Sequence, residues 1–433
     1  MGGFHKKTIR DVDLRDKRVL LRVDYNVPLD DNHQVVDDYR LRMSLPTLEY
    51  LLEQNCKIIA MSHLGRPEGY DPNYSLAPVA RRLQQLLPDA NIAFIDGTSG
   101  EAVKKALSKR HKSTITLLEN VRFDPREESE DEEYARELAT YADVFVQDAF
   151  GVVHRKHVTL TGVPKYLPSY AGFLLEKEYE IINGALEEPE RPLMAVIGGA
   201  KISDKIKVLK RFVEKADKVA VVGAMANTFL LAKGVEIGSS LAEPEQVRLA
   251  QEIIELAESK AEQGFELIIP SDFVVSRSID GNMATRVVET DDYFYIDLEF
   301  YPKQPPKHSH TVEADESILD IGPASSNYIA GQITSSKTVL WSGTAGVAEK
   351  PGLHGAAAPF AHGSLTLAKA MSGQFRARTK PFTIAGGGDT VAFIESIPGL
   401  REALGHVSTG GSTSLELMSG NSLPGVEVLE DKD

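Results

Sequence analysis

Short apolar runs alternate with helix-like segments along nearly the whole chain, and this alternation constrains the fold more than any other feature. In the first half the runs are VLLRVDYNVP (19–28), KIIAMSHLGRP (57–67), NIAFID (91–96), TITLLENVRF (114–123) and DVFVQDAFG (143–151). In the second half they are LMAVIGGAK (193–201), KVAVVGAMANT (218–228), ELIIPSDF (266–273), SILDIGP (317–323), TVLWSGTAG (338–346), FTIAGGGDT (382–390) and HVSTGGSTS (406–414). Near-continuous apolar strands separated by helices are typical of parallel sheets covered on both faces. The two series therefore predict an α/β fold with two doubly wound, Rossmann-like parallel-sheet domains.

The length of the chain also favours two domains, because 433 residues exceed what one ordinary hydrophobic core supports. The segment VPKYLPSYAGFLLEKEYEIINGALEEPERP (163–192) reads as a connecting helix that ends in an acidic, proline-bearing boundary. We therefore expect an N-terminal domain over residues 1–165, a hinge helix over 166–190 and a C-terminal domain over 191–420. The stretch DDYFYIDLEFYPKQPPKHSH (291–310) breaks the pattern and is expected to be a surface insertion.

Charge and composition exclude several classes of partner. The formal net charge of −15 argues against binding to nucleic acid or to an acidic membrane surface. No apolar run approaches the ~20 residues that span a bilayer, and the first residues lack the apolar core of a signal peptide. The single cysteine, Cys56, cannot form an intrachain disulfide and fits a reducing compartment. We expect a cytoplasmic protein whose clustered basic residues serve a small anionic ligand.

Polar side chains follow the strands of the first series. They are Asp24, Asn26, His63, Arg66, Asn120, Arg122 and Asp148, with His154, Arg155 and His157 just beyond and Arg40 at the start of a helix. Because the carboxyl ends of parallel strands share one edge of a sheet, these side chains should form a basic pocket. Arginine forks bind phosphate and carboxylate through two hydrogen bonds, so the pocket suits an anionic substrate. A metal site of His63, His154 and His157 is an alternative, although the neighbouring arginines would repel a cation.

The second series ends its strands in glycine and small residues instead. GGAKISDK, GAMANT, GPASS, SGTAG, GGGDT and TGGSTS would give a surface lined by backbone, which suits a nucleotide and its phosphates. Lys201 and Lys205 lie around a predicted helix start, where either could face a polyphosphate. Asp389 and Thr390 are expected to N-cap a helix that runs to Ser396, with Asp389 also able to hold Mg²⁺. The alternative for the glycine triplet is a flexible loop.

Two common nucleotide motifs are missing from the sequence. There is no G-x-x-x-x-G-K-[ST] loop, and no G-x-G-x-x-G follows the first strand, so neither a P-loop enzyme nor a dinucleotide-binding domain is indicated. A basic pocket on one domain and a phosphate-and-magnesium cradle on the other are typical of a kinase.

With these residues in view, the whole chain resembles the phosphoglycerate kinase family. The motifs that carry the resemblance are RVDYNVP, SHLGRP, LLENVRF, DAFGVVHRKH, GGAKISDKI, MANTF, DIGP, GGGDT and HVSTGG. The resemblance implies that phosphoglycerate is bound by Asp24, Asn26, Arg40, His63, Arg66, Arg122 and Arg155. It implies that Mg-ADP or Mg-ATP is held by Lys201, Lys205, Glu349, Gly386, Gly387, Gly388, Asp389 and Thr390, with Asp389 toward the metal. It further implies a monomer whose C-terminal tail, residues 421–433, returns to the first domain.

The reaction implied by the resemblance is reversible phosphoryl transfer between 1,3-bisphosphoglycerate and ADP, which gives 3-phosphoglycerate and ATP in glycolysis or gluconeogenesis. We expect Arg40 and Lys201 to neutralise transition-state charge, with support from amides near Gly387 and Gly410. Hinge closure would exclude water. Two rivals stay open: another two-domain kinase that acts on a small phosphorylated acid, and a catalytically inactive nucleotide-binding or scaffolding relative. Departures from the family pattern at Ala324, Ser342 and Ala348 favour the second.

Overall fold

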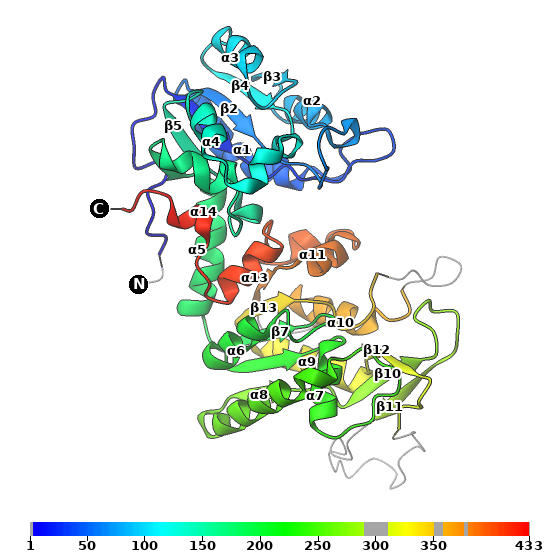
Figure 1. The fold of residues 1–433 in the computed structure, drawn as a ribbon. Coiled ribbons are helices and arrows are strands. Elements are labelled where there is room, and N and C mark those ends of the chain that lie inside the picture. Colours follow the sequence, from blue (N-terminus) through cyan, green and yellow to red (C-terminus); the bar gives the residue numbers. More distant parts are fainter. Residues whose placement is uncertain (1–2, 290–310, 350–357, 376–379, 433) are drawn as a thin grey trace. The chain divides into compact units, whose positions relative to one another are not determined.

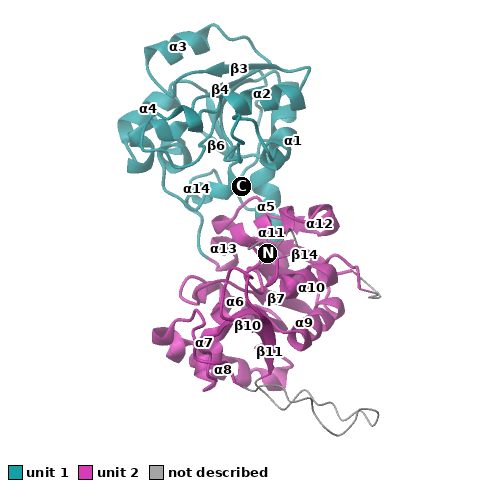
Figure 2. Ribbon diagram, turned by 90° about the vertical axis from the view of Figure 1, so that its right-hand side faces the viewer, with its two compact units in different colours: residues 1–183, 421–433 teal, residues 184–420 magenta. Residues whose placement is uncertain are grey.

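The computed structural model describes residues 3–289, 311–349, 358–375 and 380–432 (Figure 1). The chain divides into two compact units, one made of residues 1–183 and 421–433 and the other of residues 184–420 (Figure 2). The boundary between them in the sequence falls inside helix α5 (Phe173–Glu187). The insertion expected at residues 291–310 lies outside the described residues.

The first unit is built on a parallel sheet of six strands in the order β3-β4-β2-β1-β5-β6. The strands are β1 (Arg18–Arg22), β2 (Lys57–Met61), β3 (Asn91–Ile95), β4 (Thr114–Leu118), β5 (Val144–Gln147) and β6 (Ser169–Ala171). Besides α5, the α-helices are α1 (Tyr39–Glu53), α2 (Ala77–Leu86), α3 (Glu101–Ser108), α4 (Glu132–Ala139) and α14 (Pro424–Glu427). Strand β6 is a difference from the sequence prediction, which placed only helix in this region.

Alternation along the strands explains why helices cover both faces of this sheet. In β1, Val19 and Leu21 pack into one core cluster, which also holds Leu41 of α1. Leu20 points the other way, into a second cluster that holds Leu138 of α4. Successive side chains of a strand alternate between faces, so an all-apolar strand needs cover on both sides. The α/β class predicted from the apolar runs is confirmed.

The second unit has a parallel sheet of six strands in the order β15-β14-β13-β7-β8-β9. These strands are β7 (Leu193–Ile197), β8 (Lys218–Val221), β9 (Glu266–Ile268), β13 (Thr338–Ser342), β14 (Phe382–Ala385) and β15 (His406–Val407). The helices are α6 (Ile206–Lys215), α7 (Met225–Ala232), α8 (Val247–Ser259), α9 (Pro323–Ser335), α10 (His362–Met371), α11 (Gly388–Glu395), α12 (Leu400–Ala403) and α13 (Ser412–Met418).

A separate antiparallel sheet in the second unit corrects the sequence prediction. The run SILDIGP was expected to join the main parallel sheet, but it forms β12 (Ser317–Ile321), which pairs with β10 (Asp272–Ser276). Strand β10 also pairs with β11 (Thr285–Glu289). Phe273 and Val275 of β10 pack with Val288 of β11 and Leu230 of α7 into a small core of their own. Apolar content alone does not specify which sheet a strand joins.

Both ends of the described chain pack into the first unit. The backbone N–H of Lys7 donates to the carbonyl of Glu430 at 2.7 Å, and the Gly425 N–H donates to the Val153 carbonyl at 2.8 Å. Lys6 adds a buried contact from its Nζ to the Leu429 carbonyl at 3.0 Å. Residues 421–432 are thus tied to the first unit by backbone hydrogen bonds. Within the described residues, no helix has both the length and the apolar character that crossing a bilayer demands.

Buried aspartates at strand ends fix three helix N-termini. Their carboxylates accept backbone N–H groups as follows: Asp148 from Leu174 and Leu175 of α5, Asp272 from Ala324 and Ser325 of α9, and Asp320 from Gly363 of α10. First-turn N–H groups have no partner inside their own helix, so a carboxylate supplied by a neighbouring strand satisfies them. Each of these three helices is thereby tied at its start to a strand that precedes it in the sequence.

Candidate functional site

The first polar cluster lies where β1 and β2 end. Asp24 is buried two residues after β1, and its Oδ2 pairs with Nη1 of Arg40 in the first turn of α1. The Nδ1 of His63, which follows β2, lies 3.8 Å from the Asp24 Oδ1. Burial opposes ionisation of Asp24, but the charges of Arg40 and its other neighbours outweigh burial and hold the pKa of Asp24 below its usual value. Asp24 is therefore a carboxylate that orients Arg40.

His63 is neutral in this cluster. Burial lowers its pKa well below the ordinary value, and the nearby Arg22 and Arg122 act in the same direction, against Asp24. A neutral imidazole can donate one hydrogen bond and accept another. His63 is thus suited to binding a polar group of a substrate rather than to adding positive charge.

Three of the predicted arginines line a single hollow of about 610 Å³ in the first unit: Arg66, Arg122 and Arg155. Arg66 follows β2, Arg122 lies on the short 3₁₀ helix Val121–Phe123 after β4, and Arg155 lies beyond β5. The Nη1 of Arg122 donates to the Gly65 carbonyl, which fixes its guanidinium at the wall of the hollow. A hollow with three guanidinium groups is suited to a phosphate or carboxylate.

Asn26 stands at the edge of a neighbouring hollow of about 500 Å³, which Gly65 also lines. Its Oδ1 accepts the Gly65 N–H at 2.9 Å, and its own N–H donates to the Asp24 Oδ1 at 3.2 Å. Gly65 therefore connects Asn26, through its N–H, with Arg122, through its carbonyl. The seven residues predicted to bind substrate all lie along one edge of the first sheet.

Other predicted strand-end residues have structural roles, which corrects the interpretation of the whole set as a pocket. Asn120 is fully buried and braces the loop after β2 by donating to the Leu64 and Tyr74 carbonyls at 2.7 and 2.9 Å. Asp148 caps α5, and burial raises its pKa to about 7. Sequence position places a residue at the strand end but does not say whether its side chain turns toward solvent or into a helix terminus.

The alternative metal site is not formed. Burial lowers the pKa of His157 to about 4, and His157 lies beside Glu127 rather than beside His63. His154 contacts the Nε of Arg155 at 3.3 Å. In the parts of the chain that the structure describes, no three His, Cys, Asp or Glu side chains gather as metal ligands.

Sequence reasoning missed Arg22, which supports the cluster from within β1. Arg22 is almost fully buried, and its Nε donates to Thr159 Oγ1 at 2.9 Å while its Nη2 lies 3.4 Å from His63 Nδ1. Thr159 in turn donates to the buried Glu127 at 2.6 Å. The signal was present, since Arg22 interrupts the apolar run VLLRV. A charged residue in a fully apolar strand needs buried partners.

The loops at the corresponding edge of the second sheet are packed backbone against backbone. A Cβ at Gly343, which follows β13 with φ +105°, would overlap the carbonyl of Gly198 after β7. The Gly343 N–H donates to Thr390 Oγ1 at 2.6 Å, and its carbonyl accepts from Trp341 Nε1 at 2.8 Å. Some glycines of this edge therefore serve loop-to-loop contact, which is a role that the sequence prediction did not give them.

The two lysines of this edge have different environments. Lys205 is partly buried and donates to the carbonyls of Gly198 and Ser342, and burial lowers its pKa to about 8 against the opposing charge of Asp389. Lys201 is exposed. Lys205 therefore joins the loops of the sheet edge, whereas the ammonium group of Lys201 is accessible to a ligand.

The GGGDT segment forms the N-terminus of α11, with one correction to the prediction. The N-cap residue is Gly387, at φ +99°, rather than Asp389 or Thr390. Only glycine adopts this conformation without strain, which suits Gly387 to the N-cap position. Helix α11 therefore begins at Gly388, one residue before Asp389. Asp389 is exposed in the first turn, and Thr390 is buried with its hydroxyl bound to the Gly343 N–H. A Cβ at Gly388 would meet open space, so the first turn is accessible from outside.

The remaining predicted positions differ in how accessible they are. The Gly410 N–H donates to Ser408 Oγ at 3.0 Å, so this amide already has a partner. A Cβ at Gly386 would lie 3.0 Å from Ser414 Oγ, which shows close packing. Glu349 is exposed directly before residues 350–357, which are not described. Ser342 is buried, with its Oγ 3.3 Å from Lys205 Nζ.

Comparison with known proteins decides the family. The family model described as phosphoglycerate kinase matches residues 9–421. The chain belongs to the phosphoglycerate kinase family. The chain is 46% identical over 432 residues to phosphoglycerate kinase of Chloroflexus aggregans, covering 99% of this chain and 100% of that one. It is 43% identical over 430 residues to phosphoglycerate kinase of Herpetosiphon aurantiacus, with the same coverage.

Solved structures of phosphoglycerate kinases share the fold. That of Coxiella burnetii matches with a TM-score of 0.79 and 33% identity over 98% of both chains. That of Pyrococcus horikoshii matches with a TM-score of 0.76 and 26% identity, again over 98% of both chains. The resemblance inferred from ordered motifs is confirmed.

Proposed function

We propose that each unit of this phosphoglycerate kinase binds one of the two substrates, at the polar edge of its parallel sheet. The reaction is reversible phosphoryl transfer between 1,3-bisphosphoglycerate and ADP, which places the enzyme in glycolysis. The observation that supports this assignment is the different chemistry of the two edges. In the first unit arginines surround a hollow, whereas in the second unit backbone amides are available at a helix N-terminus. Substrate is therefore assigned to residues 1–165 with the tail 421–433, and nucleotide to residues 191–420.

In the first unit we assign the phosphate of 3-phosphoglycerate to the hollow of Arg66, Arg122 and Arg155, because bidentate guanidinium contacts suit a doubly charged group. Arg40 is assigned to the reacting end of the substrate. Its pairing with Asp24 keeps it oriented, and its side chain retains 29% exposure. Asn26 and His63 supply neutral hydrogen bonds next to these charges.

In the second unit the nucleotide phosphates are assigned to the first turn of α11, where N–H groups and the helix dipole favour an anion. Asp389 fits a magnesium ligand, because its carboxylate is exposed at that turn and Mg²⁺ usually takes one or two carboxylates plus phosphate oxygens. Bound Mg²⁺ would neutralise charge on the phosphates. Lys201 reaches the same polyphosphate from the loop before α6, while Lys205 holds that loop in place.

Phosphoryl transfer needs no side-chain nucleophile here, because the attacking oxygen belongs to a substrate. The transition state is loose, with charge spread over the equatorial oxygens, so positioning and electrostatic stabilisation account for most of the catalysis. Arg40 and Lys201 are the side chains that we assign to this charge, supported by the amide of Gly387. A coupled assay with 3-phosphoglycerate and a panel of nucleotides tests the assignment. Absence of turnover with every nucleotide would favour the inactive-relative alternative.

The first expected result is that a substitution in one unit weakens the binding of only one substrate. Arg66→Ala or Arg155→Ala should weaken 3-phosphoglycerate binding by about tenfold, the equivalent of ~1.4 kcal/mol, while Mg-ADP binding stays close to normal. Asp389→Ala should weaken Mg-ADP and leave 3-phosphoglycerate unchanged. Calorimetric titration of each variant with each substrate gives the comparison. If one substitution weakened the binding of both substrates equally, the assignment of each substrate to its own unit would be contradicted.

Relaxed discrimination among purine nucleotides is a second expected result. An aromatic contact or one hydrogen bond is worth ~1 kcal/mol, and the chain has Ala348 and Ser342 where the family usually offers such groups. Steady-state kinetics with ATP, GTP and ITP should show that the unmodified enzyme prefers ATP less strongly than the Ala348→Phe variant does. Ser342→Asn is a poorer test, because Ser342 is buried. A strong ATP preference that the Ala348→Phe change leaves untouched would rule out the relaxed pocket.

We further propose a cytoplasmic, monomeric enzyme without nucleic-acid or membrane partners. The net charge of −15 and the single buried cysteine support this. The hinge over residues 166–190 stays a prediction.

A further inference from the structure

One of the carboxylates that line the arginine hollow, Glu128, is paired with an arginine of the hollow. Glu128 lines the hollow together with Arg66, Arg122 and Arg155. Its Oε1 lies 3.0 Å from the Nε of Arg122. The Arg122 side chain is only 5% exposed, whereas that of Glu128 is 57% exposed. A nearly buried arginine is therefore paired with a carboxylate that reaches in from solvent.

The backbone that carries Glu128 is firmly anchored. Glu128 lies on the short 3₁₀ helix Pro125–Ser129, whose first turn is capped by Asp124 through the Arg126 N–H at 3.0 Å. The preceding Glu127 is fully buried and accepts both the N–H and the O–H of Thr159, at 3.0 and 2.6 Å. The main chain thus holds Glu128 beside Arg122, while its side chain is free to turn toward solvent.

We propose that Glu128 is a built-in counterion of Arg122, which the phosphate of 3-phosphoglycerate must displace when it binds. The proposal rests on the function assigned above to Arg122. An arginine buried without a partner is costly, so Glu128 compensates it while the hollow holds no substrate. Phosphate and carboxylate compete for the same guanidinium N–H groups. Glu128 therefore lowers the affinity for 3-phosphoglycerate and speeds its release.

The contacts of Arg122 allow this exchange. Its Nη1 donates to the Gly65 carbonyl, so the guanidinium keeps its place when Glu128 turns away. Burial lowers the pKa of Arg122, and the charges of Arg155 and Arg66 act in the same direction, while Glu128 opposes them. The exchange replaces one anion beside Arg122 by another. Glu128 thus sets the affinity of the hollow without contacting the reacting atoms.

Neutralising Glu128 should tighten binding. In Glu128→Gln, which keeps the length of the side chain, calorimetry should show 3-phosphoglycerate and inorganic phosphate each bound about 2- to 5-fold more tightly, the equivalent of ~0.4–1 kcal/mol. Glu128→Ala should act in the same direction, and Mg-ADP binding should not change. Weaker or unchanged binding of 3-phosphoglycerate in both variants would overturn the proposal.

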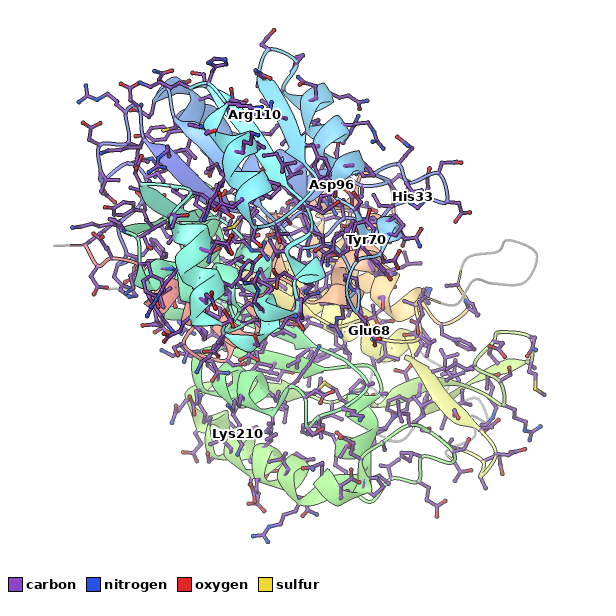
Figure 3. The ribbon with its side chains drawn as sticks, turned by 45° about the horizontal axis from the view of Figure 1, so that its top comes forward. His33, Glu68, Tyr70, Asp96, Arg110 and Lys210 are labelled. Carbon is purple, nitrogen blue, oxygen red and sulfur yellow. The ribbon has the colours of Figure 1, made fainter. Side chains whose placement is uncertain are left out.

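Glu68 supplies the matched control. Glu68 (labelled in Figure 3) lines the same hollow, and Glu68→Gln removes the same charge as Glu128→Gln. Among the described residues, however, Glu68 forms no ion pair. Glu68→Gln should tighten binding clearly less than Glu128→Gln. An equal effect would show that general charge, rather than pairing with Arg122, controls affinity, and would overturn the proposal.

Combining Glu128→Gln with Arg122→Ala tests the counterion role of Glu128 separately from the substrate-binding role of Arg122. Arg122→Ala alone should weaken 3-phosphoglycerate binding, and adding Glu128→Gln to it should give little further tightening. Full tightening in that background would overturn the counterion proposal alone, with Arg122 still a binding residue. If Arg122→Ala left binding unchanged, the assigned function of Arg122 would be wrong and the counterion proposal would fall with it.

Discussion

Arg40→Ala should lower turnover by about 10²–10³-fold while weakening ground-state binding of either substrate far less, because a donor aimed at transition-state charge is worth ~3–4 kcal/mol. The pairing with Asp24 holds Arg40 in position before substrate binds, so no reorganisation is needed at the moment of reaction. Steady-state kinetics with calorimetric Kd values separates the two effects. Arg42→Ala is the matched control on the same helix, since Arg42 pairs with Asp38 and should leave turnover near that of the unmodified enzyme.

Lys201→Ala should behave like Arg40→Ala from the other unit. Lys210→Ala is its control, because Lys210 is an exposed lysine on the outside of α6 (Figure 3). Turnover near the unmodified level in either Arg40→Ala or Lys201→Ala would show that the affected residue does not stabilise the transition state.

Gly343→Ala should destabilise the second unit by about 3 kcal/mol. The left-handed φ of +105° costs a residue with a Cβ ~1–2 kcal/mol, and the overlap with the Gly198 carbonyl adds a crowding cost of similar size. Trp341 is the only tryptophan and is buried two residues away, so its fluorescence follows urea unfolding of this unit.

Gly331→Ala is the control for that substitution. Gly331 lies inside α9, where a Cβ would meet nothing within 4 Å, so alanine should stabilise the helix by ~0.5–1 kcal/mol. A Gly343→Ala midpoint equal to that of the unmodified protein would show that the loops after β7 and β13 can separate without cost.

The sequence was sufficient for the fold class because its signals are local and repeated. Most of the parallel strands are apolar runs, and most of these runs are followed by a helix, so hydrophobic pattern and connection rules agree. The antiparallel sheet was missed because SILDIGP is as apolar as the other runs, and its partner is fixed by tertiary contacts with Phe273 and Leu230. Strand β6 was missed because three residues carry too little pattern.

The candidate site was predictable in position but not in detail. Arg66, Arg122 and Arg155 share one hollow because strand ends share one sheet edge, which is a rule of topology. Asn120 and Asp148 obey the same rule, yet their side chains satisfy buried backbone groups. Only packing distinguishes the two outcomes. Arg22 lay outside the rule because it belongs to β1 itself, as the last residue of the strand, and its side chain is buried against Thr159 and His63.

The first unit is discontinuous in the sequence, and this has a consequence for the order in which the protein is made. A ribosome adds ~5–20 residues per second, so residues 184–420 take tens of seconds to appear after α5 has begun. During that time the Val153 carbonyl and the Lys7 N–H lack the tail groups that they bond in the finished protein. The second unit, which is continuous, is fully synthesised before the first. The first unit therefore cannot form its last native backbone contacts until residues 425–432 have been made, after the whole of the second unit.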